Sequence, residues 1–187
     1  MQIFKIMVLT VFLLFIGQAQ ALEYNHIETT NSRIDFSYQQ MGVRIDGHFK
    51  KFDAKLKFDP NQLSTSSVTV NVDLNSLDTG SAEGNDEVRG KLWFNSKVFP
   101  DATFISKKIK PLGQHKYEVF GKLTIKGHSQ DLIVPITLKD KGSSVVFEGN
   151  FLIKRADFAI GEGPWATFDT VANEIPVKFY LIAVSSK

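Results

Sequence analysis

The fold is decided by residues 151–184, which read FLIKRADFAIGEGPWATFDTVANEIPVKFYLIAV. The stretch opens with an alternating segment, in which Phe151 and Ile153 share a face, and closes with a second apolar segment, residues 175–184. Alternation with a period of two is typical of a β-strand with one buried face. The two segments flank a loop rich in glycine and aromatic residues. We interpret this arrangement as the rim of a β-barrel and the loop as the mouth of an interior cavity.

Residues 1–21 have the pattern of an export signal. Lys5 precedes an apolar run over residues 6–16, and Ala19-Gln20-Ala21 supplies the small residues of a cleavage site. The run is shorter than the roughly 20 residues that a membrane-spanning helix needs. We therefore expect a cleaved signal peptide over 1–21 and one mature domain over 22–187. The expected location is the bacterial periplasm, with secretion as the alternative.

The composition excludes several classes of function. The 187 residues include no cysteine, which excludes disulfides, thiolate metal sites and cysteine nucleophiles. The formal net charge is only +2, so there is no electrostatic reason to expect nucleic acid as a partner. An exported domain without disulfides fits the periplasm better than the extracellular medium.

Period-two alternation recurs along most of the mature chain, in segments bounded by turn-forming residues. About eight strands are expected, which is the number at which a closed barrel just holds side chains or one small ligand. The pair Met41-Gly42 predicts a bend within the first strand, and residues 82–95 predict a short helical segment. We predict an all-β fold, an extended lipocalin-like antiparallel β-barrel.

The faces opposite the apolar stripes carry charged residues such as Asp53, Lys55 and Lys57. A barrel that crosses a membrane presents apolar side chains outward, and charges there are costly. The pattern therefore favours a barrel with its apolar face inward, one that does not span a membrane.

Residues with reactive or metal-binding side chains do not cluster in the sequence. The histidines are His26, His48, His115 and His128, and they show no paired ligand spacing. We expect no metal, no cofactor and no catalytic residue. Arg155 and Asp157 are interpreted as an ion pair between neighbours on one face of a strand. Recognition of an anionic head group by a buried Arg155 is the alternative.

Many phenylalanines fall on the inward phase of the strands, and this periodicity alone favours a filled core over a cavity. A set of motifs, through the family that it resembles, favours a cavity instead. In chain order they lie at residues 32–36 (SRIDF), 47–52 (GHFKKF), 75–80 (NSLDTG), 93–94 (WF) ahead of 99–100 (FP), 121–127 (GKLTIKG) and 155–161 (RADFAIG). Their order and spacing resemble the YceI-like polyisoprenoid-binding proteins of the bacterial periplasm, over nearly the whole mature chain.

The resemblance implies a lipocalin-like barrel around a long apolar tunnel that holds an isoprenoid or fatty-acyl lipid. It implies binding, transport or storage, with no enzymatic activity, and a homodimer is left open as an alternative. The candidate lining residues are Phe36, Phe49, Phe52, Phe58, Leu123, Phe147, Phe151, Ile153, Trp165, Val177 and Phe179. Among them, Trp165 is the candidate gate.

The chain departs from the family pattern at Asn85-Asp86, where relatives often carry Arg-Asp, and at Ala159, where glycine is more usual. The head group of the lipid is therefore not inferred from the resemblance. Two other functions stay open. One is an enzyme or redox partner that acts on a bound quinone-like molecule, with Asp157, Glu162 and His128 as the first residues to examine. The other is a structural or stress-protective barrel with a filled core.

Overall fold

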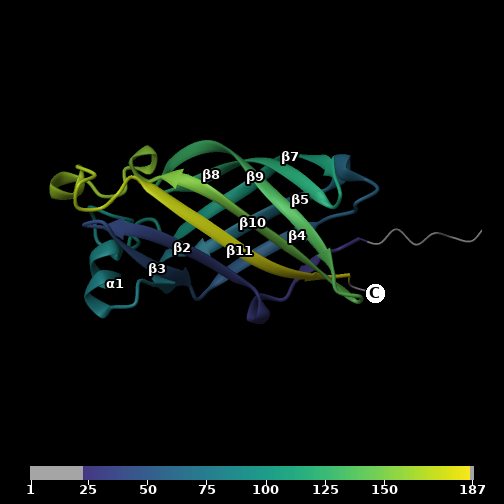
Figure 1. The fold of residues 1–187 in the computed structure, drawn as a ribbon, viewed down its shortest axis with the longest axis horizontal. Coiled ribbons are helices and arrows are strands. Elements are labelled where there is room, and N and C mark those ends of the chain that lie inside the picture. Colours follow the sequence, from purple (N-terminus) through teal and green to yellow (C-terminus); the bar gives the residue numbers. More distant parts are fainter. Residues whose placement is uncertain (1–22, 186–187) are drawn as a thin grey trace, which may run out of the picture.

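A computed structural model describes residues 23–185, so the predicted signal peptide lies outside the described residues. One antiparallel sheet and one α-helix dominate the fold (Figure 1). The strands are β1 (His26–Ile27), β2 (Arg33–Gln40), β3 (Val43–Phe49), β4 (Phe52–Lys57), β5 (Ser67–Asp73), β6 (Leu77–Asp78), β7 (Asp101–Gly113), β8 (Lys116–Ile125), β9 (His128–Asp140), β10 (Ser144–Lys154) and β11 (Glu174–Val184), and the helix is α1 (Ala82–Arg89).

The sheet has 11 strands in the order β4-β5-β7-β8-β9-β10-β11-β2-β3-β6, and β1 pairs with β11. The sheet curls on itself, which confirms the predicted antiparallel, lipocalin-like architecture (Figure 1). The two strands predicted at the ends of residues 151–184 form its longest uninterrupted pairing. Ser144 lies opposite Val184, and Lys154 lies opposite Glu174.

The alternation in sequence accounts for the inner and outer faces of the strands. In β8, Tyr117, Val119 and Leu123 share the inner face and are buried. Lys116 and Lys122 belong to the opposite phase of the strand and are exposed. Successive side chains of a strand point to opposite faces, so apolar residues at every second position line the interior. No helix in residues 23–185 is long and apolar enough to cross a membrane.

The chain near the N-terminus closes one end of the curled sheet. Tyr24 exchanges two backbone hydrogen bonds with Phe58, at 2.8 and 2.9 Å, while β1 pairs with β11 on its other side. The Phe58 ring meets Tyr117 and Phe147 edge to face, with centroids 5.4 and 5.1 Å apart. We call the cluster of Tyr24, Ile27, Phe58, Tyr117 and Phe147 the sealed end. It lies where β1 pairs with the last residues of β11, at the right in Figure 1.

The opposite end carries α1, the turns that follow it and the loop over residues 155–173, and we call it the helix end (Figure 1). The helix lies within the segment predicted to be helical, 82–95, and the Ser81 hydroxyl caps it by accepting a hydrogen bond from the Gly84 amide at 3.0 Å. It ends at Arg89 before Gly90, and turns continue over residues 91–94.

The predicted bend at Met41-Gly42 is wrong. These residues form a tight turn that reverses the chain, so that Gln40 pairs with Val43 and β2 and β3 are two strands. Both turn residues have positive φ, 51° and 80°. Two-residue hairpin turns of type I′ need positive φ at both positions, and a methionine gives little sign of it in a sequence.

Candidate functional site

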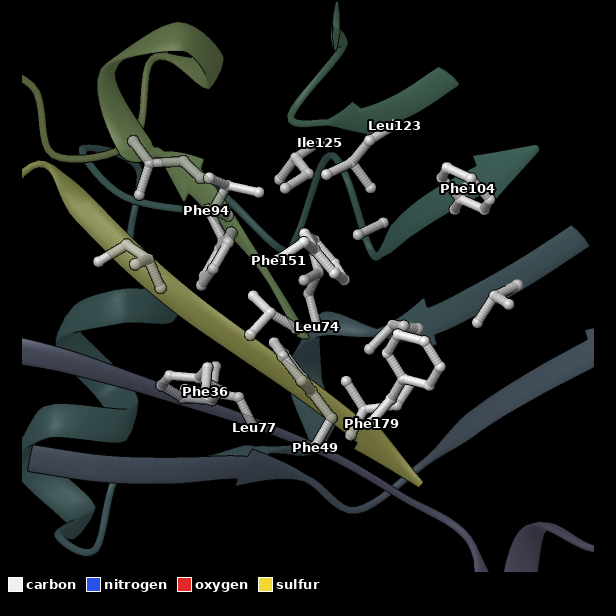
Figure 2. Close-up of a pocket in the computed structure, with 18 of the residues that line it drawn as sticks. Phe36, Phe49, Leu74, Leu77, Phe94, Phe104, Leu123, Ile125, Phe151 and Phe179 are labelled. Carbon is white, nitrogen blue, oxygen red and sulfur yellow. The ribbon is translucent and has the colours of Figure 1, made fainter. Parts of the chain in front are cut away.

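The curled sheet encloses a cavity of about 530 Å³ that runs from the sealed end to the helix end. This volume lies within the roughly 300–1,000 Å³ of typical small-molecule sites. Figure 2 shows side chains from β2, β3, β8, β10 and β11 turned toward this common space, among them Phe36, Phe49, Leu123, Phe151 and Phe179. The interior is therefore hollow, which contradicts the alternative of a filled core.

The structure places most of the predicted lining residues in the cavity wall. They are Phe36, Phe49, Phe58, Leu123, Phe147, Phe151, Ile153, Trp165, Val177 and Phe179. Phe52 is the exception, because it packs against the core cluster of the sealed end and does not line the cavity. Contact of any of these side chains with a ligand stays a prediction.

Sequence reasoning missed part of the wall. Phe104 is two positions from Ala102 on β7, so the two side chains share the inner face. This period-two spacing was sufficient to predict that Phe104 lines the cavity. Leu77 and Phe94 also line the cavity (Figure 2), but they lie in a two-residue strand and a turn, where no periodicity exists to detect. Leu74, which is also part of the wall, continues the alternation of Val68, Val70 and Val72.

Three glycines of the sheet lie beneath phenylalanine rings of the wall. A Cβ atom added at Gly47 would overlap the Phe36 ring, and one added at Gly149 would overlap the Phe179 ring. Gly121 has the same relation to the Phe104 ring. Because the glycines have no side chain, these rings lie against the neighbouring strand, and the space in the middle of the barrel stays open.

Arg155 organises the loop at the helix end. Its side chain is 1% exposed, and its guanidinium donates to six backbone carbonyls at 2.7–3.2 Å. The acceptors belong to Ile160, Gly161, Trp165, Thr167, Val171 and Ala172. The rings of Trp93 and Phe168 lie 5.5 and 5.1 Å from the guanidinium carbon. Desolvation lowers the pKa of Arg155 from its ordinary value.

The predicted pairing of Arg155 with Asp157 is wrong. Residues 155–158 form a 3₁₀ turn, so the two side chains are not same-face neighbours of a strand. Asp157 is exposed, whereas Arg155 is directed into the loop. The alternative interpretation of Arg155 as an anion-binding residue also fails on geometry. A guanidinium has five N–H groups, and all five are used by the six carbonyls.

The polar part of the cavity wall lies at the helix end. It consists of Tyr38, Gln40 and Thr79, with Glu83 and Glu87 from α1 and Arg155 from the loop. The indole nitrogen of Trp93 donates to the Glu87 carboxylate at 3.1 Å. Burial raises the pKa of Tyr38, although a hydrogen bond with Thr79 opposes the shift.

Trp165, the candidate gate, is half-buried at this end, and its ring centroid lies 5.4 Å from that of Trp93. Next to it, an ion pair holds the loop to the sheet. Lys126, which is 8% exposed, donates to the Glu162 carboxylate and to the Ala159 carbonyl, each at 2.6 Å. This contact with Lys126 lowers the pKa of Glu162.

The residues named for an enzymatic alternative are exposed and outside the cavity wall. Asp157, Glu162 and His128 lie on the outer surface near the loop, and Glu162 is engaged by Lys126. A molecule in the cavity would not reach them. Residues 23–185 also contain no cluster of histidine and acidic side chains that could hold a metal ion.

Comparisons with known proteins place the chain in a family. A family model for the YceI-like domain matches residues 26–183, which is most of the chain. This chain belongs to the YceI family. The YceI-family relatives include the UPF0312 protein of Yersinia pestis (strain Pestoides F), which is 34% identical over 156 residues, 77% of this chain and 79% of the relative.

Solved structures have the same YceI fold. BcnA of Burkholderia cenocepacia matches with a TM-score of 0.82 and 41% identity, and the match covers 85% of this chain and 100% of BcnA. A polyisoprenoid binding domain from Saccharophagus degradans matches with a TM-score of 0.68, covering 88% of this chain and 99% of that domain. Its identity of 18% makes it evidence for the fold alone.

Proposed function

We propose that this YceI-family protein binds an isoprenoid or another long-chain amphiphilic lipid. The apolar chain lies in the cavity, and the head group lies at the helix end. The observation that carries the proposal is the 530 Å³ cavity, whose wall is apolar from the sealed end to the polar residues beside α1. The same fold occurs in a solved structure described as a polyisoprenoid binding domain, so the architecture is compatible with this function.

The energetics of such a site need no specific hydrogen bonds along the chain. Each buried CH₂ group contributes about 0.8 kcal/mol, before the cost of ordering the lipid is subtracted. A chain of about a dozen carbons therefore binds well if it is fully enclosed. Asp157, Glu162 and His128, the residues named for an enzymatic alternative, lie on the outer surface, so they do not support catalysis on an enclosed molecule.

We further propose that residues 1–21 direct export to the periplasm, and that the protein carries or stores the lipid there. The support is the pattern of the first 21 residues and the absence of cysteine. Detection of the mature chain in the periplasmic fraction, with an N-terminus near Leu22, is the expected result. Retention of the full-length chain in the cytoplasm would contradict the proposal.

Native mass spectrometry of the purified protein with geranylgeraniol tests lipid binding. We expect a 1:1 complex with the wild type. Val177 points into the cavity, so Val177→Trp fills part of the space and is expected to weaken uptake by roughly tenfold or more. The neighbouring Lys178 is exposed on the outer face, so Lys178→Trp is a matched control that should bind like the wild type.

Two results would contradict lipid binding. One is the absence of any complex with prenyl or acyl lipids across the wild type and both variants. The other is equal loss of uptake in Val177→Trp and Lys178→Trp, which would mean that the effect comes from a general disturbance of β11.

A further inference from the structure

We propose that the helix end selects lipids whose head group donates hydrogen bonds and carries no negative charge, such as an alcohol, a phenol or an amine. Phosphate and carboxylate head groups are disfavoured. This inference rests on the proposed function and names its head-group class. Among the described residues, the charged side chains of the cavity wall are Glu83, Glu87 and Arg155.

The one cation in the wall offers no donor to a ligand. All five N–H groups of Arg155 are used by six backbone carbonyls, as described above. The Trp93 and Phe168 rings lie over its guanidinium. An anionic head group that reached this wall would therefore find no free hydrogen bond on the cation, and bidentate recognition of a phosphate is excluded.

The neighbouring cations, Lys126, Arg89 and Lys91, lie outside the cavity wall. The Lys126 ammonium is held by Ala159 and Glu162. Arg89 donates to the Asp86 carboxylate and the Leu77 carbonyl, each at 3.4 Å. Its buried Nε has no hydrogen-bond partner among the described residues, but Arg89 is not part of the cavity wall. Lys91 is exposed, and it is not part of the cavity wall.

The two carboxylates of the wall are available to a ligand. Glu83 and Glu87 lie four residues apart on α1, so they share one face of the helix. Among the described residues of the cavity wall, only Glu83 and Glu87 are exposed to solvent. We therefore place the opening of the cavity beside them. Glu87 accepts one hydrogen bond from Trp93, and Glu83 has no hydrogen-bond partner among the described residues.

A carboxylate only accepts hydrogen bonds, so a hydroxyl or ammonium group pairs with it and an anion does not. The uncharged wall residues Tyr38, Gln40 and Thr79 lie at the same end. They can hydrogen-bond a neutral head group without adding positive charge. The opening thus combines unused acceptors with two negative charges, and these charges repel an incoming anion, most strongly at low salt.

The test compares three lipids with the same chain: geranylgeraniol, geranylgeranylamine and geranylgeranyl phosphate. Binding is followed by tryptophan fluorescence at low salt, below the concentration at which each lipid aggregates. For the wild type, we expect the phosphate to bind roughly tenfold or more weakly than the alcohol, and the amine to bind at least as tightly. Raising the salt concentration should narrow this difference.

The double variant Glu83→Gln/Glu87→Gln removes both charges and keeps good helix formers at exposed positions. It should bring the phosphate to within about threefold of the alcohol, since the repulsion has gone. Asp53→Asn/Glu118→Gln changes the net charge by the same amount outside the cavity wall, and it should keep the wild-type preference. Circular dichroism checks that both variants are folded.

The outcomes separate the two proposals. If the wild type binds all three lipids equally, or the phosphate best, lipid binding stands and the head-group selection is wrong. The selection is also wrong if Glu83→Gln/Glu87→Gln still discriminates against the phosphate as the wild type does. If none of the three lipids binds, the proposed function itself is wrong, and the head-group selection is wrong with it.

Discussion

The sealed end and the helix end close the same barrel by different physical means. At the sealed end, Phe58 packs edge to face on Tyr117 and Phe147, and the closure is stabilised mainly by burial of apolar side chains. At the helix end, one buried guanidinium gathers a long loop through hydrogen bonds to its carbonyls. The first closure is a packed core. The second combines an apolar cluster, which includes Trp93, Phe158 and Ile160, with a polar scaffold beside the exposed acids of the cavity wall.

We expect the sealed end to contribute more than the helix end to the free energy of unfolding. Phe58→Ala removes a side chain that is 1% exposed, and it should lower the free energy of unfolding by about 3–5 kcal/mol. Urea unfolding followed by circular dichroism measures this change. Phe120→Ala is the control, because Phe120 is only half-buried beside Lys110, and its loss should cost clearly less. Equal costs for the two variants would contradict the assignment of a core to this end.

Arg155→Lys should affect the helix end locally. A lysine has three donors and cannot reach six carbonyls, so several buried carbonyls lose their partner, at a total cost of about 2–4 kcal/mol. Hydrogen exchange should show faster exchange in residues 155–173 and unchanged protection in β8 and β9. Arg44→Lys, at an exposed arginine paired with Asp46, should stay within about 0.5 kcal/mol of the wild type. Uniform loss of protection throughout the barrel would contradict a local scaffold.

Gly149→Ala should narrow the cavity between the two ends. The added methyl group overlaps both the Phe179 ring and the backbone oxygen of Pro135, and such overpacking costs about 1–3 kcal/mol or more. Uptake of geranylgeraniol should fall as the ring enters the cavity. In a double-mutant cycle with Phe179→Leu, the combined cost should be smaller than the sum of the single costs. Strict additivity would show that the ring and the glycine do not interact.

The smallest effect is expected from lowering the pH, which weakens the contact between Lys126 and Glu162. The Lys126 contact lowers the pKa of Glu162, so the stabilisation from this pair is present above the ordinary glutamate range and is lost as the pH falls through the lowered pKa. Glu162→Gln should therefore speed hydrogen exchange in the loop at neutral pH, and its difference from the wild type should shrink as the pH falls below the ordinary glutamate range and through the lowered pKa. A difference between the two proteins that does not shrink in acid would contradict this role.

The barrel and the inward direction of most of its wall residues were predictable, because alternation is a local signal that a strand carries in its own sequence. Phe151, Ile153 and Val177 are placed in the wall by that signal. The cavity itself was expected only from the resemblance to the YceI-like proteins. The role of Arg155 was not predictable, since its acceptors extend as far as Ala172 and only the folded loop brings them together. The acids of α1 were missed for a similar reason. Nothing in the helix itself shows that Glu83 and Glu87 face the cavity.

The chain contains two tryptophans, Trp93 and Trp165, and both lie at the helix end. Their fluorescence therefore reports which part of a bound lipid lies there. The most direct measurement compares quenching by two long-chain alcohols of equal length, one brominated next to the hydroxyl and the other at the end of the chain. With the head group at the helix end, the first quenches strongly and the second weakly. Equal quenching, or stronger quenching by the second alcohol, would contradict the proposed orientation.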